Sequence, residues 1–343
     1  MTSSPEMPVL KPPVLNPPPL RPPTNRAPLL QARGLRKVFA NGVRAVDGVD
    51  ITVFAGQTLG IVGESGCGKS TTARLLLRLL KPDRGELHFD GHDLGHARGR
   101  ALRRLRAGLQ VVPQHPLTSL NPRMSVGDSI AFNLRVQGFG RPARTARVRE
   151  LLGQVGLPRS FENRYPHELS GGQLQRVAVA RALATRPKLI ICDEAVSALD
   201  KSVQAQVLNL LVDIQRETGV AYIFISHDLA VVEHISDRVA VMYLGRIVEE
   251  APAEQLWREP LHPYTKALLS AAPGRDRQRV VLAGDPPSPV NLPVGCRFQP
   301  RCAQAVEACA TFDPELVSAR GHPHRMAACI QVKPGPVTQP VPV

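Results

Sequence analysis

Two stretches of the sequence have the composition of an anion-binding helix start. The first, GESGCGKST at residues 63–71, fits the phosphate-loop pattern G-x-x-x-x-G-K-[ST]. Its glycines let backbone N–H groups turn around the β- and γ-phosphates of a nucleotide, while Lys69 adds positive charge and Ser70 can ligate Mg²⁺. The predicted nucleotide contacts are Gly63, Glu64, Ser65, Gly66, Cys67, Gly68, Lys69, Ser70 and Thr71.

The second stretch, ELSGGQLQRVAVARAL, lies about a hundred residues further on, at residues 168–183. Ser170 can cap a helix, and Gly171, Gly172 and Gln173 follow it as a second anion site. Because the first loop can surround the phosphates from one side only, we expect another protomer to cover the open side. Two protomers arranged head to tail would each place residues 170–173 on the other's γ-phosphate, so that ATP joins them and hydrolysis releases them.

Polar residues also stand at the ends of three apolar runs. Asp193 and Glu194 end KLIICDE, Gln114 ends LQVVPQ, and His227 follows YIFIS. Since the carboxyl ends of parallel strands meet at one edge of a sheet, these side chains are expected to lie together. Glu194 is the predicted general base for water, and Gln114, His227 and Lys69 are its predicted catalytic neighbours. Mg²⁺ is assigned to Ser70, Gln114 and Asp193.

The elements that must position these residues follow from the apolar pattern. Residues 58–63 form a buried strand before the phosphate loop, and residues 69–81 have helical spacing. Short strands are expected before residue 56, helices between residues 116 and 187, and a hairpin around residues 244–246. A disordered Pro-rich tail (1–30) is expected before the nucleotide-binding domain (31–250, helical subdomain about 115–187), and an extension (251–343) follows.

Composition narrows the class of protein. The formal net charge of +14 and the pI of about 10.1 suggest anionic neighbours, which could be phosphates, nucleic acid or an anionic membrane face. The sequence has no apolar run of about 18 residues and no secretory h-region, so we expect a cytosolic chain with reduced thiols.

Taken together, the phosphate loop, Gln114, ELSGGQ, LIICDE, SALD and ISHD resemble the ABC ATPase cassette in order and spacing over residues 31–250. The resemblance implies an α/β fold of the ABC-type P-loop NTPases: a RecA-like core, an antiparallel β-subdomain and a helical signature subdomain. It also implies a nucleotide sandwiched between two chains, adenine stacking on Phe39, and a nucleotide-site role for Asp200. Ala195 stands where that family usually has Pro.

The stretches HPLTSLNPRMSVGDSI and EPLHPYTKALLSAAP resemble ATPase subunits of the oligopeptide/dipeptide (peptide/nickel) permease family. This implies an importer for di- or oligopeptides, with the chain on the cytoplasmic face of the inner membrane as a peripheral subunit. The implied partners are a sister ATPase or a second copy, two membrane permeases and, indirectly, an extracytoplasmic solute-binding protein. Nickel or another small solute is the alternative cargo. A DNA-handling ABC ATPase is the alternative class, although no nucleic acid partner is expected.

Four cysteines lie near the end of the chain, at Cys296, Cys302, Cys309 and Cys329. The gaps between them contain no C-x-x-C pair, which argues against an ordinary zinc ribbon. GCRFQPRC and GHPHRMAAC resemble the C-terminal Cys motif of the same permease ATPases, where a [4Fe–4S] cluster is implied. Zinc and four unliganded thiols remain the alternatives.

Overall fold

The protein is built around one long mixed sheet. The structure is a computed structural model, which describes residues 27–271, 280, 282 and 284–335 of the chain. The strand order of the sheet is β11-β12-β10-β9-β3-β8-β7-β6. Strands β3 (Thr58–Val62), β6 (Leu109–Val112), β7 (Leu189–Asp193), β8 (Ala221–Ile225) and β9 (Arg238–Tyr243) form its parallel part. The predicted buried parallel strands are therefore confirmed.

Each parallel strand is apolar because both faces of the sheet are covered. In β7, Leu189 and Ile191 pack into one hydrophobic core, whereas Ile190 and Cys192 pack into the other. This alternation is the two-residue period of a strand, with a core on each side in place of solvent. The carboxyl ends of β6, β7, β8 and β3 consequently lie at one sheet edge.

A second sheet, in the order β2-β1-β4-β5, forms the expected antiparallel β-subdomain. Its strands are β1 (Leu30–Val38), β2 (Arg44–Val53), β4 (Arg84–Phe89) and β5 (His92–Asp93). Strands β4 and β5 and the following helix α2 (Gly99–Gly108) were not predicted from the sequence. The predicted Pro-rich tail lies mostly outside the described residues, which begin at residue 27.

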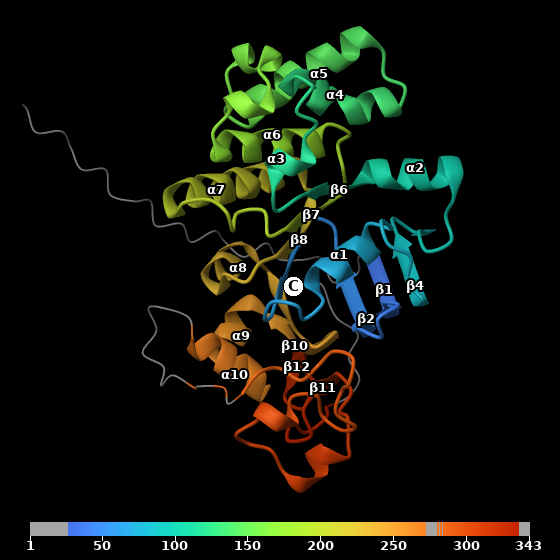
Figure 1. The fold of residues 1–343 in the computed structure, drawn as a ribbon, viewed down its shortest axis with the longest axis vertical. Helices are drawn as coiled ribbons and strands as arrows, with labels where there is room; N and C mark the ends of the chain where they lie inside the picture. The colour runs from blue at the N-terminus through green and yellow to red at the C-terminus, as the bar shows by residue number, and fades with distance from the viewer. Residues whose placement is uncertain (1–26, 272–279, 281, 283, 336–343) are drawn as a thin grey trace, which may run out of the picture.

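The region predicted to be helical contains α3 (Pro116–Ser119), α4 (Val126–Val136), α5 (Arg141–Gln154), α6 (Gly171–Leu183) and the 3-10 turns Arg159–Asn163 and Pro166–Glu168. The cap of α4 is Ser125, whose hydroxyl accepts the N–H of Asp128. Helix α1 (Lys69–Leu76) follows the phosphate loop, while α7 (Lys201–Thr218) and α8 (Leu229–Ile235) follow β7 and β8. Helices α4–α6 gather at one end of the molecule (Figure 1).

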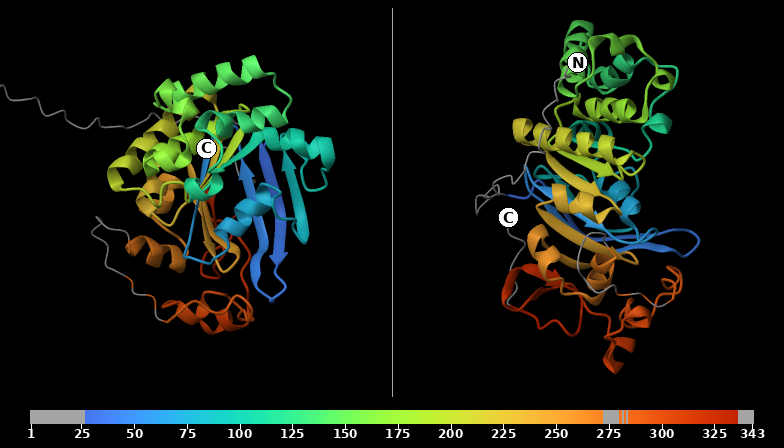
Figure 2. Two further views of the ribbon diagram at one scale, coloured as in Figure 1. Left: turned by 45° about the horizontal axis from the view of Figure 1, so that its top comes forward. Right: turned by 90° about the vertical axis from the view of Figure 1, so that its left-hand side faces the viewer.

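The C-terminal segment lies at the opposite end, with the central sheet between it and α4–α6 (Figures 1 and 2). Strands β9 and β10 (Arg246–Pro252) form the predicted hairpin, whose turn residues Leu244 and Gly245 have φ of 41° and 81°. Helices α9 (Ala253–Arg258) and α10 (Pro263–Ser270) and the short turns Gln299–Arg301 and Glu307–Ala310 follow. Strand β12 (His322–Ala327) then pairs with β10, and β11 (Val317–Ala319) pairs with β12, so this segment extends the central sheet.

No helix in the described ranges is both long enough and apolar enough to span a bilayer.

Candidate functional site

The phosphate loop connects β3 to α1, and its glycines are required by close backbone contacts. A Cβ on Gly63 would lie 2.1 Å from the carbonyl oxygen of Met242, and one on Gly68 would lie 2.1 Å from that of Ala45. Both residues also have positive φ, 154° and 110°. The loop is therefore pressed against β9 and β2 in a conformation that side chains would not allow.

Lys69 is the positive charge of this loop. Its side chain is buried, and Nζ donates to the carbonyl oxygens of Gly63 at 2.7 Å and Glu64 at 2.8 Å. The first turn of α1 contains no acidic residue, so neither the ammonium nor the helix dipole is neutralised there. This arrangement suits a phosphate anion.

Ser70 and Asp193 bring a hydroxyl and a carboxylate together at the start of α1. The Oγ of Ser70 donates to Oδ1 of Asp193 at 3.0 Å, across 123 residues of sequence. Burial raises the pKa of the Asp193 carboxyl above its ordinary value. A hydroxyl and a carboxylate beside bound phosphates are the oxygen ligands that Mg²⁺ takes in nucleotide sites.

The predicted general base, Glu194, is the meeting point of three strand ends. Gln114 Nε2 donates to Glu194 Oε2 at 2.8 Å, and His227 Nδ1 lies 3.4 Å from the same oxygen. The backbone of Glu194 has φ of 49°, and its N–H donates to Ile225 O at the end of β8. The expectation that these side chains lie together is confirmed. Non-glycine residues with a positive φ are found frequently at functional sites.

The second glycine stretch begins α6, as predicted. Ser170 Oγ accepts the N–H of Gln173 at 3.4 Å, and the Gln173 side chain accepts the N–H of Ser170 at 3.0 Å. This capping box keeps the hydrogen bonds of both side chains within their own turn. Gly171 is exposed, whereas a Cβ on Gly172 would lie 2.5 Å from Val203 of α7. Gly172 is thus also a packing residue.

The remaining predicted contacts lie in different surroundings. Phe39 is 39% exposed in the turn between β1 and β2. Asp200 caps α7, where its carboxylate accepts the N–H of Val203 at 2.9 Å. Cys67 is buried, which raises the pKa of its thiol. Ser65, Gly66 and Thr71 lie in or directly after the loop, as the motif requires.

Glu64 differs from the sequence-based expectation. Its N–H does not point freely at a phosphate, because it donates to the hydroxyl of Tyr264 in α10 at 2.9 Å. Its carboxylate contacts Nη1 of Arg301 at 2.9 Å. Both partners belong to stretches, HPYT and FQPRC, in which no role was predicted for Tyr264 or Arg301. Contacts across 200 and 237 residues left no local signal that could have revealed them.

The four C-terminal cysteines line one small cavity. Its walls also include Phe298, Phe312, Pro314 and Ile330, together with the buried imidazole of His262 and the side chains of Gln299, Gln304 and Gln331. Burial raises the pKa of the Cys296, Cys302 and Cys329 thiols. Within the described residues, however, no group of three or more His, Cys, Asp or Glu side chains has the geometry to hold a single metal ion.

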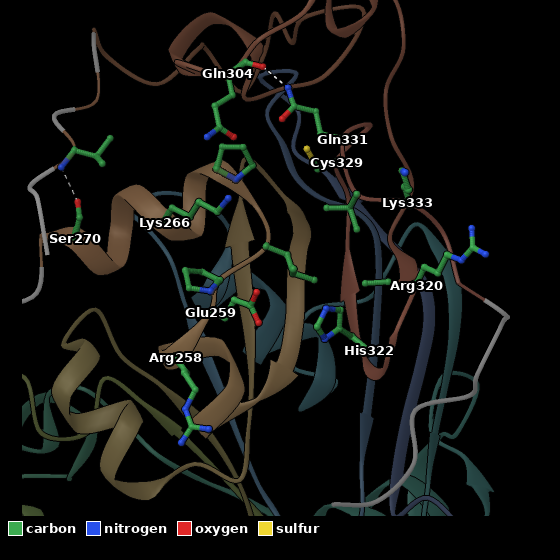
Figure 3. Close-up of a pocket in the computed structure, with 16 residues that line it drawn as sticks. Arg258, Glu259, Lys266, Ser270, Gln304, Arg320, His322, Cys329, Gln331 and Lys333 are labelled. Atoms are coloured by element: carbon green, nitrogen blue, oxygen red, sulfur yellow. Dashed lines mark hydrogen bonds between the residues drawn. The ribbon is translucent and has the colours of Figure 1, made fainter.

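A wider cavity, of about 640 Å³, adjoins the thiols between α9, α10 and the β11–β12 hairpin (Figure 3). Cys329 lines both cavities. The rim of the wider one carries Arg258, Lys266, Arg320 and Lys333. Solvent and ions in the wider cavity can therefore reach the Cys329 thiol.

Comparison with known proteins fits this geometry. Residues 46–197 match the family model described as ABC transporter, and residues 248–309 match the oligopeptide/dipeptide transporter C-terminal region. A protein of Sinorhizobium fredii, named as a probable peptide ABC transporter ATP-binding protein, is 55% identical over 80% of this chain and 79% of its own. The oligopeptide transport ATP-binding protein OppF of Salmonella typhimurium is 49% identical over 85% of this chain and 89% of its own.

Among solved structures, cbiO1 of Clostridium perfringens, part of the ABC transporter complex cbiONQ, superposes with a TM-score of 0.62 at 29% identity, covering 68% of this chain and 92% of that one. A dimeric ATP-binding cassette in a post-hydrolysis state with ADP and Pi gives 0.60 at 28% identity, covering 65% and 98%. Fold and site thus define an ABC-type ATPase. The chain belongs to the ABC transporter family, among the ATP-binding proteins that carry the oligopeptide/dipeptide transporter C-terminal region.

Proposed function

We propose that this chain hydrolyses ATP to power a membrane importer of di- and oligopeptides. The observation that carries the proposal is the convergence of Gln114 and His227 on Glu194, one residue from the Ser70–Asp193 pair. Relatives about 50% identical are named as peptide transport ATP-binding proteins, which supports the cargo class.

The residues divide the work of phosphoryl transfer to water. Glu194 accepts a hydrogen bond from Gln114 on one carboxylate oxygen, and His227 lies beside the same oxygen, which aims the carboxylate as a general base for the attacking water. Lys69 stabilises the charge on the phosphate oxygens, and His227 steadies the γ-phosphate. Ser70, Asp193 and Gln114 would hold Mg²⁺, which supplies further charge neutralisation.

The nucleotide site is completed by a second protomer, either an identical chain or a sister subunit. The exposed Gly171 and the positive N-terminal end of α6 would then face the partner's γ-phosphate. A solved relative of the same fold is dimeric with ADP and Pi, which supports this arrangement. Phe39 and Asp200 are assigned to the adenine and to the dimer interface, respectively.

A groove of about 440 Å³ between α2 and α4 is the proposed docking site for a membrane permease. Three of its apolar side chains are exposed, namely Leu79 at 63%, Phe132 at 43% and Val136 at 42%. Exposed apolar side chains collected in one groove are typical of an interaction site. The proposed membrane partners are two permeases, which in turn contact a solute-binding protein. The chain would then be a peripheral subunit on the cytoplasmic side of the membrane.

The four thiols would hold a [4Fe–4S] cluster. Four thiols that line one cavity beside Phe298, Phe312 and Ile330 suit iron–sulfur ligation, in which cysteine thiolates hold the cluster. A four-iron cluster spreads its thiolates farther apart than one ion does, which is compatible with the lack of a single-ion site among the described residues. We assign residues 251–343 to this extension and residues 31–250 to the nucleotide-binding domain.

The test is to reconstitute the chain with its permeases in vesicles and to compare the parent with Glu194→Gln. We expect peptide uptake and ATP turnover in the parent. The variant should bind ATP with parental affinity and lose turnover by a factor of roughly 10² to 10⁴, the usual contribution of a general base. Uptake of nickel but not of peptide would identify nickel as the cargo in place of peptides. Undiminished ATP turnover in Glu194→Gln would refute the role of Glu194 as general base.

A further inference from the structure

We propose that Arg301 and Tyr264 are positioning residues for the phosphate loop, so that ATP affinity depends on the C-terminal segment that carries them. The proposal rests on the ATP site proposed above. It concerns residues outside the nucleotide-binding motifs, and it gives the segment around the four cysteines a direct task in nucleotide binding.

The first contact is an ion pair. Nη1 of Arg301 lies 2.9 Å from Oε2 and 3.2 Å from Oε1 of Glu64, the residue that follows the first glycine of the loop. The Arg301 side chain is 8% exposed and that of Glu64 is 26% exposed. A charge-assisted pair shielded in this way is stronger than a pair in open solvent.

The second contact holds the backbone of the same residue. The N–H of Glu64 donates to the hydroxyl of Tyr264 at 2.9 Å, and Tyr264 is fully buried. On the other side, Lys69 Nζ contacts the carbonyl oxygens of Gly63 and Glu64. The peptide group before Glu64 is therefore held by both Tyr264 and Lys69, and the peptide group after it is held by Lys69.

The segment that supplies these contacts is itself anchored. The ring of Phe298 packs at 5.5 Å from that of Tyr264 and at 5.4 Å from that of Tyr243. Arg297 donates to the carbonyl oxygen of Leu244 at 2.6 Å and forms a buried pair with Asp47. The short stretch 296–302 is thus held to β2 and to the β9–β10 turn while Arg301 reaches the loop.

The contacts of Arg301 and Tyr264 with Glu64 pre-organise the phosphate loop for nucleotide binding. A loop whose N–H groups already point inward loses less conformational freedom when a phosphate binds. Releasing Glu64 should therefore weaken ATP and ADP together, because the loop contacts the β-phosphate of both. It should change the saturated rate of hydrolysis much less, since the loop binds ground state and transition state alike.

The experiment measures the Kd of Mg-ATP and Mg-ADP for the full-length chain by calorimetry, with the melting temperature of the nucleotide-free chain beside it. Arg301→Met should raise both Kd values roughly five- to tenfold, and Arg301→Lys should recover at least half of the loss. Tyr264→Phe should raise them roughly two- to threefold. Arg320→Met is the matched control, since Arg320 lies in the same segment but on the wider cavity, and it should leave both constants unchanged.

Glu64→Ala is a second variant that removes the Glu64–Arg301 ion pair without changing the C-terminal segment. A loss of affinity in this variant therefore cannot result from misfolding of that segment. The double variant Glu64→Ala/Arg301→Met should bind ATP no worse than the weaker single variant. Three results would each overturn the proposal: Glu64→Ala and Arg301→Met effects that add in full, a lowered melting temperature of Arg301→Met with unchanged Kd values, or Kd values of Arg301→Met within twofold of the parent. If the parent itself fails to bind ATP, the proposed function fails instead.

Discussion

Gln114 donates a 2.8 Å hydrogen bond to Glu194, and this bond joins the end of β6 to the end of β7 at the centre of the site. Gln114 also lies two residues before the helical region, which begins with α3 at Pro116. A movement of that region would therefore shift a side chain that touches the general base. This link gives a structural route by which contact with a permease on α4 could bear on ATP hydrolysis.

The first prediction concerns Gly171. A side chain has room there, since an added Cβ would lie 3.7 Å from Leu199, its nearest neighbour. Gly171→Asp should leave the fold intact, because a carboxylate in the first turn of α6 favours the helix dipole. It should abolish ATP-dependent dimerisation, because the new charge would face the partner's γ-phosphate. Sedimentation with ATP checks this, with Gly171→Ala as the control that should still dimerise.

The second prediction concerns the groove beside α4. Phe132→Asp places a charge among exposed apolar side chains and should disrupt assembly with the permease. ATP binding by the isolated chain should remain parental, since Phe132 lies outside the nucleotide site. Co-purification with the permease measures the first effect and calorimetry the second. Retention of the full complex by the variant would remove the groove as the docking site.

The third prediction concerns the thiols. Protein prepared without oxygen should be brown and contain about four irons per chain, as a [4Fe–4S] cluster requires. Cys309→Ser should lower the iron content and the absorbance, because Cys309 lines the cavity with the other three cysteines. Cys192→Ser is the control, since Cys192 belongs to β7, is buried in the core and does not line the cavity. Colourless parent protein with one bound zinc would favour the zinc alternative.

The fourth prediction concerns pH. Burial raises the pKa of Asp237, whose Oδ2 accepts the N–H of Thr58 at 2.7 Å. A carboxyl with a raised pKa binds its proton more tightly in the folded state. Its contribution to stability is therefore complete below the unfolded pKa of about 3.9, and it is lost as pH rises through the folded pKa.

Asp237→Asn keeps an acceptor for Thr58 but removes the titration. The unfolding free energy of the parent should therefore fall relative to that of the variant as pH rises from about 4. Urea titrations at several pH values measure this difference. A pH-independent difference would contradict the assignment.

Much of the site was predictable because its residues stand in local patterns. The phosphate loop needs an apolar strand, glycines and a helix start in sequence, and β3 and α1 have them. Asp193, Gln114 and His227 end strands, and parallel strands bring such ends to one edge whatever the strand order. The capping box of Ser170 and Gln173 is likewise a property of four consecutive residues.

The contacts of the C-terminal segment were not predictable in this way. Nothing near Arg301 indicates that it reaches Glu64, 237 residues away, or that β12 pairs with β10. Strand β4 begins with Arg84 and Gly85 and is largely exposed at its start, so its apolar pattern was too weak to read. These features depend on tertiary packing, which local sequence patterns do not reveal.

The most direct test of the account is the mass of the nucleotide-trapped protein. Glu194→Gln, saturated with ATP, should sediment as a dimer that returns to monomer when ATP is removed, and Gly171→Asp in the same background should stay monomeric. If the chain pairs only with a sister subunit, the same result is expected for the mixture of the two. An ATP-loaded Glu194→Gln protein that stays monomeric both alone and with its sister would contradict the claim that two protomers enclose the nucleotide.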